Sequence, residues 1–108
     1  MGLADAVQGA RHIAQQIGWQ DELGGAIDLS GATITGYRRN VATRIDTVLD
    51  GDLDVVSPGS AGSFTWTYGS IDVLEYGEFD VQFIATYADL SKEKSLFARW
   101  VVHEAMDV

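Results

Sequence analysis

The sequence has no cysteine, a single proline and no run of eighteen or more apolar residues. Without cysteine the chain can form no disulfide, no thiolate metal site and no cysteine nucleophile, so its stability must come from packing. The lack of a long apolar run excludes a membrane-spanning helix. Residues 1–10 also lack the basic-then-apolar layout of a secretory signal. We therefore expect a soluble protein without a signal peptide.

Basic residues are scarce as well, with seven against sixteen acidic residues and a net charge of −9. A chain this acidic repels phosphate backbones and anionic membranes over most of its surface. We therefore expect neither a nucleic-acid partner nor a membrane partner. The one basic cluster, Arg38, Arg39 and Arg44, is too small to reverse this and is either a solvated strand end or a small anion site.

The length and the apolar content predict one domain. A chain of 108 residues, 46% of them hydrophobic, can build one core but not two. The sequence contains no internal repeat, low-complexity tract or linker. We divide it into an N-terminal arm (residues 1–10), a single domain (residues 11–103) and a C-terminal tail (residues 104–108).

Apolar and polar residues alternate along several segments, which is the pattern of half-buried antiparallel strands. The clearest segment is 77–87, and the same alternation occurs at 64–68 and 32–39. Residues 95–103 are apolar on both faces, which is typical of a strand covered on both sides or lying at a subunit contact.

Turn-forming residues separate these segments about every dozen residues, as they do in sandwiches and small barrels. Asp50-Gly51 lies between residues 42–49 and 53–56, an arrangement that predicts a hairpin, and residues 89–94 predict another turn. The pattern predicts an all-β protein, an Ig-like antiparallel β-sandwich of about seven strands.

The N-terminal third fits two interpretations. Its apolar residues follow a helical stripe, but Gly9 and Gly18 interrupt that stripe, and Ile17 and Trp19 would share one face of a strand. We expect a flexible or partly helical arm up to about Gly9 and then a strand over residues 11–20. A longer helix remains the alternative.

No arrangement of residues points to catalysis. Ser60 lacks the Gly-x-Ser-x-Gly frame of a nucleophile elbow. His12 and His103 lack the local carboxylate pattern of a metal site. No glycine-rich loop joins a strand to a helix and could hold a phosphate. We therefore expect no enzymatic activity, no cofactor and no metal.

One acidic triplet, Asp50, Asp52 and Asp54, has the oxygen-rich character of a calcium site. An EF-hand loop would need glycine and glutamate where this chain has Val55 and Ala61. On a strand the three carboxylates would point to one side. We favour a charged, solvent-facing strand start that discourages edge pairing, with calcium as the alternative.

Four aromatic residues are candidates for an interface: Trp66, Tyr68, Phe97 and Trp100. In a small sandwich such side chains belong to the core or to an interface, because they bury so much area. A carbohydrate-binding or adhesion module would expose Trp66, Tyr68 and Trp100 together, flanked by polar groups. An assembly protein would bury them and expose a broad, flat apolar patch.

A short motif precedes the segment at 32–39: Asp28, Leu29, Ser30, Gly31 and Ala32. Further features follow it in order, namely Asp50-Gly51, Gly62 before the segment 63–66, and residues 72–77, which end in Gly77 and lead into the segment 79–87. This ordered set resembles the N-terminal domain of phage baseplate upper proteins and related phage tail Ig-like domains over residues 11–102.

The residues of the motif also have a physical role of their own. We expect Leu29 and Ile34 to be buried and Asp28 to cap a turn through its own backbone. Gly31 would supply a turn conformation closed to residues with a Cβ atom. The motif therefore locates a fold and not an active site.

The resemblance implies a virion structural protein, a tail, baseplate or neck component that is assembled in the host cytoplasm. Its partners would be other virion structural proteins. Ring symmetry is expected as well, since closed homo-oligomers are usual in such assemblies. The alternatives are a capsid decoration protein and the carbohydrate-binding or adhesion Ig-like module.

Overall fold

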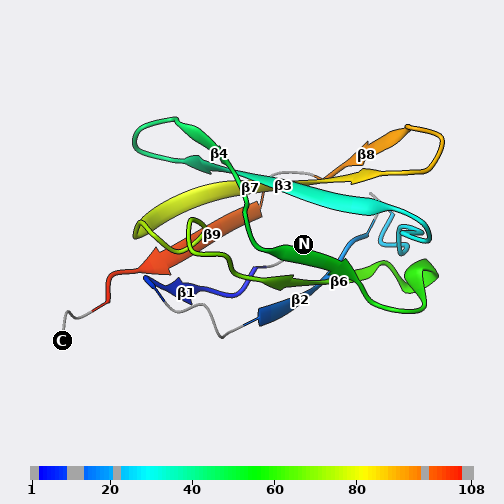
Figure 1. Cartoon of the computed structure of the whole chain (residues 1–108), viewed down its shortest axis with the longest axis horizontal. Coiled ribbons are helices and arrows are strands. Elements are labelled where there is room, and N and C mark those ends of the chain that lie inside the picture. Colours follow the sequence, from blue (N-terminus) through cyan, green and yellow to red (C-terminus); the bar gives the residue numbers. More distant parts are fainter. Residues whose placement is uncertain (1–2, 10–13, 21–22, 96–97, 106–108) are drawn as a thin grey trace.

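The computed structural model describes residues 3–9, 14–20, 23–95 and 98–105, which fold into two β-sheets packed as a sandwich (Figure 1). The large sheet has the order β1-β9-β7-β3-β4, with β8 beside β7; its strands are β1 (Ala6–Val7), β3 (Thr33–Asn40), β4 (Asp46–Val48), β7 (Gly77–Thr86), β8 (Lys92–Lys94) and β9 (Ala98–His103). The small sheet has the order β2-β6-β5 and contains β2 (Ala14–Gly18), β5 (Asp52–Val55) and β6 (Ser63–Thr67). The predicted all-β sandwich is confirmed.

Nine strands occur in the described part of the chain, where about seven were predicted. The difference comes from β1 and β8, which have two and three residues; β4, of three residues, lies within the predicted segment 42–49. Alternation cannot be detected over so short a segment. One turn of 3₁₀-helix, η1 (Gly59–Ala61), lies between β5 and β6.

Strand β7 is the centre of the large sheet and follows the predicted alternation. Its buried side chains are Phe79, Val81, Phe83 and Ala85. Across the sandwich Phe83 packs on Phe64 of β6, with ring centroids 4.9 Å apart. Trp100, on the neighbouring strand β9 of the same sheet, packs on Trp66 of β6 at 4.6 Å. Contacts of this kind add to the large area that aromatic side chains bury.

The last strand is covered on one side only among the described residues, so for residues 95–103 the strand covered on both sides is wrong, while the strand at a subunit contact stays a prediction. In β9, Ala98, Trp100 and Val102 are buried while Arg99 and His103 are exposed. Val101 is only partly buried, because it lies on the outer face of the large sheet opposite Glu78.

The described part of the N-terminal arm is extended, so the partly helical form is wrong for residues 3–9. Strand β1 pairs in parallel with β9, with Ala6 opposite Val102, and the side chain of Ala6 is buried. This pairing gives the segment a tertiary partner, which outweighs a weak local helix preference. Strand β2 follows at residues 14–18 and pairs with β6; residues 10–13 lie outside the described residues.

The predicted hairpin at Asp50-Gly51 is wrong. Strand β4 pairs with β3 in the large sheet, whereas β5 pairs with β6 in the small sheet. Asp50-Gly51 is therefore the point at which the chain crosses from one sheet to the other. The hairpin that does form joins β3 to β4, and the Asn40 side chain caps its turn by accepting hydrogen bonds from the N–H groups of Ala42 and Thr43.

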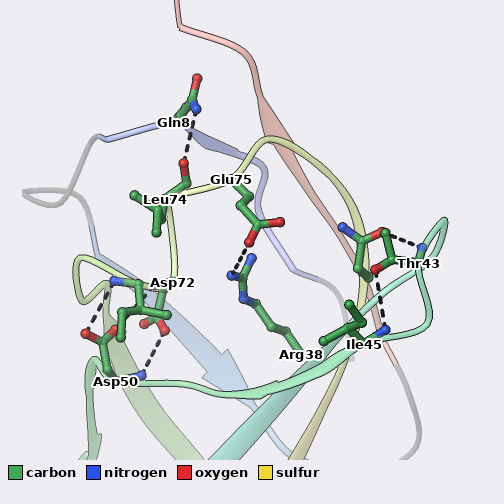
Figure 2. Close-up of polar contacts among 10 residues, drawn as sticks. Gln8, Arg38, Thr43, Ile45, Asp50, Asp72, Leu74 and Glu75 are labelled. Atoms are coloured by element: carbon green, nitrogen blue, oxygen red, sulfur yellow. Dashed lines mark hydrogen bonds and ion pairs between the residues drawn. The ribbon is translucent and has the colours of Figure 1, made fainter.

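A buried carboxylate holds this crossing in place. Asp72 is fully buried, and its Oδ1 accepts a hydrogen bond from the Asp50 N–H at 2.9 Å. Its Oδ2 accepts three more, from the N–H groups of Gly51 (3.1 Å) and Gly69 (3.0 Å) and from the Trp66 indole (3.0 Å). The Asp50 carboxylate accepts in return from the Asp72 N–H (Figure 2). We call these five residues the Asp72 clasp.

We expect Asp72→Asn to lower the free energy of unfolding by about 3 kcal/mol, because an amide places an N–H₂ group where one oxygen accepts hydrogen bonds and leaves buried donors unpaired. Urea denaturation measures the change. The matched control is Asp54→Asn, an exposed position, which should shift stability by less than about 0.5 kcal/mol. Equal losses in the two variants would show that the clasp does not hold the crossing.

Candidate functional site

A hollow of about 410 Å³ lies on the large sheet and is lined by residues of four strands. We call it the sheet hollow. Among its lining residues are Tyr37 and Arg39 of β3, Asp46 of β4, Asp80, Gln82 and Ile84 of β7, and Lys92 and Lys94 of β8. Figure 1 shows the β3–β4 and β7–β8 hairpins rising at opposite ends of the sheet.

The acidic residues of the hollow are already paired. Asp46 binds Arg39 through two hydrogen bonds, at 2.6 and 3.1 Å, and these bonds lower the pKa of the Asp46 carboxyl. Asp80 accepts a hydrogen bond of 3.0 Å from Arg99, which also contacts Glu78. A row of alternating charge therefore crosses the sheet from β4 to β9.

The two lysines of the hollow are not paired in this way. Lys92 and Lys94 are exposed, and their side chains have no hydrogen-bond or ion-pair partner among the described residues. Apart from the buried Arg38, three basic residues and two acidic ones line the hollow, on a chain whose net charge is −9. The hollow is therefore a basic area on an acidic molecule.

An exposed apolar pair lies beside these charges. Tyr37 and Val48 are directly opposite each other in the β3–β4 ladder and are 41% and 57% exposed. Ile84, partly buried, also lines the hollow. An exposed tyrosine is typical of a contact surface, and charged side chains such as the lysines belong to the polar rim of such a surface.

Arg38 points the other way, toward the core. It is only 3% exposed, its guanidinium lies 4.4 Å from the centre of the Phe79 ring, and its Nη2 is 3.9 Å from Glu75 Oε1 (Figure 2). Its Nε and Nη1 have no hydrogen-bond partner among the residues that the structure describes, and it lines a small cavity of about 90 Å³. Burial lowers the pKa of Arg38, while Glu75, Asp72 and Asp50 act in the opposite direction.

The structure separates the three arginines that formed the predicted basic cluster. Arg38 is buried, Arg39 binds Asp46 on the outer face, and Arg44 is exposed in the β3–β4 turn with φ of 64°. Three carboxylates act on the Arg38 guanidinium. An anion site is therefore not formed by this cluster.

The Asp28–Ala32 motif has the geometry expected from its residues. Asp28 Oδ1 accepts a hydrogen bond of 2.9 Å from the Ser30 N–H, and hydrogen bonds from the Ser30 side chain and backbone lower the pKa of Asp28. Leu29 is fully buried and Gly31 has φ of 73°, in the left-handed region. The Ala32 N–H closes the turn on the Leu29 carbonyl at 3.0 Å. Gly77, with φ of 139°, begins β7.

The aromatic residues that were candidates for an interface lie in the core instead. Trp66, Tyr68 and Trp100 are each less than 4% exposed and form one cluster of rings. The alternation of apolar and polar residues could not distinguish a core residue from an interface residue, because a core and an interface both bury one face of a strand. Phe97 lies outside the described residues.

The acidic triplet is divided between two roles. Asp50 belongs to the Asp72 clasp, and Asp52 and Asp54 are exposed on β5. Within the described ranges, no group of three or more His, Asp or Glu residues could hold a metal ion. His103 pairs with Asp5 at 3.0 Å, and His12 lies outside the described residues.

The chain matches no protein-family model and no curated protein. In the part of the chain that the structure describes, no helix is long and apolar enough to cross a membrane.

Lys92 and Lys94 were missed by the sequence analysis, which assigned residues 89–94 to a turn. The turn ends at Ser91, and the remaining three residues form β8. The available signal was the Lys-Glu-Lys alternation in a chain with few basic residues. Alternating charge without apolar residues does not indicate which face of a strand is buried.

We expect Arg38→Met to leave the free energy of unfolding unchanged or to raise it by up to about 1 kcal/mol, because an apolar side chain of similar length removes a buried charge with unpaired nitrogens. Thermal and urea unfolding measure the change. Phe79→Ala, which removes the ring beneath Arg38, should cost about 3–5 kcal/mol and serves as the reference for lost packing. A loss above about 2 kcal/mol in Arg38→Met would mean that the Glu75 pair stabilises the fold.

Proposed function

We propose that this protein is a structural component of a phage virion, in a tail, baseplate or neck, and that it acts by assembling with copies of itself and with other virion proteins. The sheet hollow is the observation that carries this proposal. Its lining includes the exposed Tyr37 and two unpaired lysines on an acidic chain, and the exposed Val48 lies beside it as the ladder partner of Tyr37. Interfaces between proteins combine aromatic anchors with polar surroundings in this way.

The distribution of aromatic residues supports a protein contact surface rather than a ligand pocket. The tryptophans are all buried, so the core uses the residues that would line a deep binding cleft. The hollow is shallow, on a sheet face, and its carboxylates are paired with arginines. Such a surface suits another protein better than a small molecule.

The phage assignment rests on the resemblance of the Asp28–Ala32 motif. Its turn is well defined, and the Tyr87 hydroxyl adds a hydrogen bond of 2.7 Å to the Asp28 carbonyl. The motif therefore ties the start of β3 to the end of β7. This is a structural role, consistent with a domain whose function lies in assembly.

The carbohydrate-binding alternative is less well supported, because it requires several aromatic rings exposed together. Trp66, Tyr68 and Trp100 are buried. Among the described residues the exposed aromatics are Tyr37 and Tyr76, and these line different cavities. A stacking platform for sugar rings would need both on one surface.

Sedimentation velocity over a range of concentrations tests the proposal. We expect the wild-type protein to associate, and Tyr37→Ser/Val48→Ser to weaken association at least about tenfold, because truncating a central aromatic contact removes an interface anchor. The matched control is Leu90→Asn, at an exposed apolar position in the β7–β8 turn with φ of 68°. This variant should associate as the wild type does.

One outcome would contradict the assembly function, and another would contradict only the role of the sheet hollow in it. The first is a protein that stays monomeric and binds sugars on a glycan array. The second is association that is equally strong in the wild type and in Tyr37→Ser/Val48→Ser, with both chains folded by circular dichroism, which would remove the hollow as the contact surface.

A further inference from the structure

We propose, building on the assembly function above, that copies of this chain join head to tail by pairing the free edge of β5 with the free edge of β8. Strand β5 is the end strand of the small sheet and pairs only with β6 among the described strands. Strand β8 pairs only with β7. Each therefore presents unpaired backbone groups that a second chain can bond.

The two edges carry opposite charges at the same spacing. Asp52 and Asp54 lie two residues apart on β5, so they share one face, and both are exposed. Lys92 and Lys94 lie two residues apart on β8, and both are exposed. In an antiparallel pairing Lys92 would face Asp54 while Lys94 faces Asp52, and a parallel pairing also matches two lysines with two aspartates. The spacing therefore fits in either direction.

These charges also select against other pairings. Two β5 edges would bring aspartates together, and two β8 edges would bring lysines together; like charges directly opposite each other are destabilising. Only the β5 to β8 combination is attractive. The end strand β4 offers no such charge, since its Asp46 is bound by Arg39. Charges that prevent like edges from pairing can thus specify the unlike pair.

The positions of the two edges allow the contact to repeat. Strand β7 is bonded to β3 along one side and to β8 and β9 along the other. Strand β5 packs against β3 across the sandwich, so the β5 edge and the β8 edge face opposite sides of the molecule. A contact between two different surfaces is heterologous, and its repetition gives a ring or a filament.

Charge reversal of each edge tests the contact. We expect Asp52→Lys/Asp54→Lys and Lys92→Glu/Lys94→Glu each to weaken self-association at least about tenfold, because two attractive pairs become two repulsive ones. Mixed in equal amounts, the two variants should associate as the wild type does, since each supplies the edge that the other lacks. Glu104→Lys, at an exposed position away from both edges, is the charge control and should have no effect.

The outcomes separate this contact from the assembly function. Restored association in the mixture, together with a loss in each variant alone, supports the β5 to β8 contact. If both variants associate as tightly as the wild type, the contact is wrong while assembly through the sheet hollow stands. If only Lys92→Glu/Lys94→Glu weakens association, the contact is also wrong, because these lysines line the hollow and Asp52 and Asp54 do not. If both variants are dissociated and their mixture stays dissociated, the two edges do not pair with each other. If the wild-type chain stays monomeric at about 1 mM, which is the dissociation constant of a weak contact, the proposal of head-to-tail pairing is wrong.

Discussion

The Asp72 carboxylate joins parts of the chain that local sequence does not bring together. Its oxygens accept hydrogen bonds from residues 50 and 51, which end the large-sheet segment, and from Trp66 and Gly69 of the small-sheet side. A buried carboxylate is costly unless its acceptor sites are filled, and here they are. The geometry leaves no room for larger residues, because a Cβ atom on Gly69 would collide with the Asp50 carboxylate. The position of the crossing between the sheets is therefore fixed by the hydrogen bonds of one side chain, Asp72.

Fixing this crossing determines what lies at the surface. Because the chain leaves β4 and enters the small sheet at Asp50-Gly51, β5 becomes an end strand with its aspartates exposed. The same clasp orients the Trp66 indole, whose ring then packs on Trp100 and Tyr68. Core and edge thus depend on one set of hydrogen bonds. The large aromatic residues are used inside, and the outer surface is left to charge and to a few exposed apolar side chains.

The elements that could be predicted from the sequence are those in which the pattern of apolar and polar residues shows which side chains are buried. Strand β7 alternates over ten residues, and Leu29 and Gly31 suit a turn, so both follow from local patterns. Strand partners do not follow from such patterns. Asp50-Gly51 has the local chemistry of a hairpin, but its N–H groups bond to a carboxylate more than twenty residues away. The sheet hollow was missed for the same reason, since it is assembled from β3, β4, β7 and β8 and includes a strand too short to recognise.

Because basic residues are scarce, the environment of each one affects which positive charges remain at the surface. Arg39 and Arg99 are engaged by neighbouring carboxylates, and Arg38 is buried over Phe79, which leaves the lysines of β8 exposed and unpaired among the described residues. An exposed ion pair contributes only about 0.2–1 kcal/mol, so two such pairs are too weak to hold two molecules together by themselves. Backbone pairing along an edge adds to them, and closure of a ring makes the last contact intramolecular, which raises its effective strength without any new interaction. Weak, charge-matched edges therefore suit a protein that remains separate when dilute and assembles cooperatively when many copies are brought together.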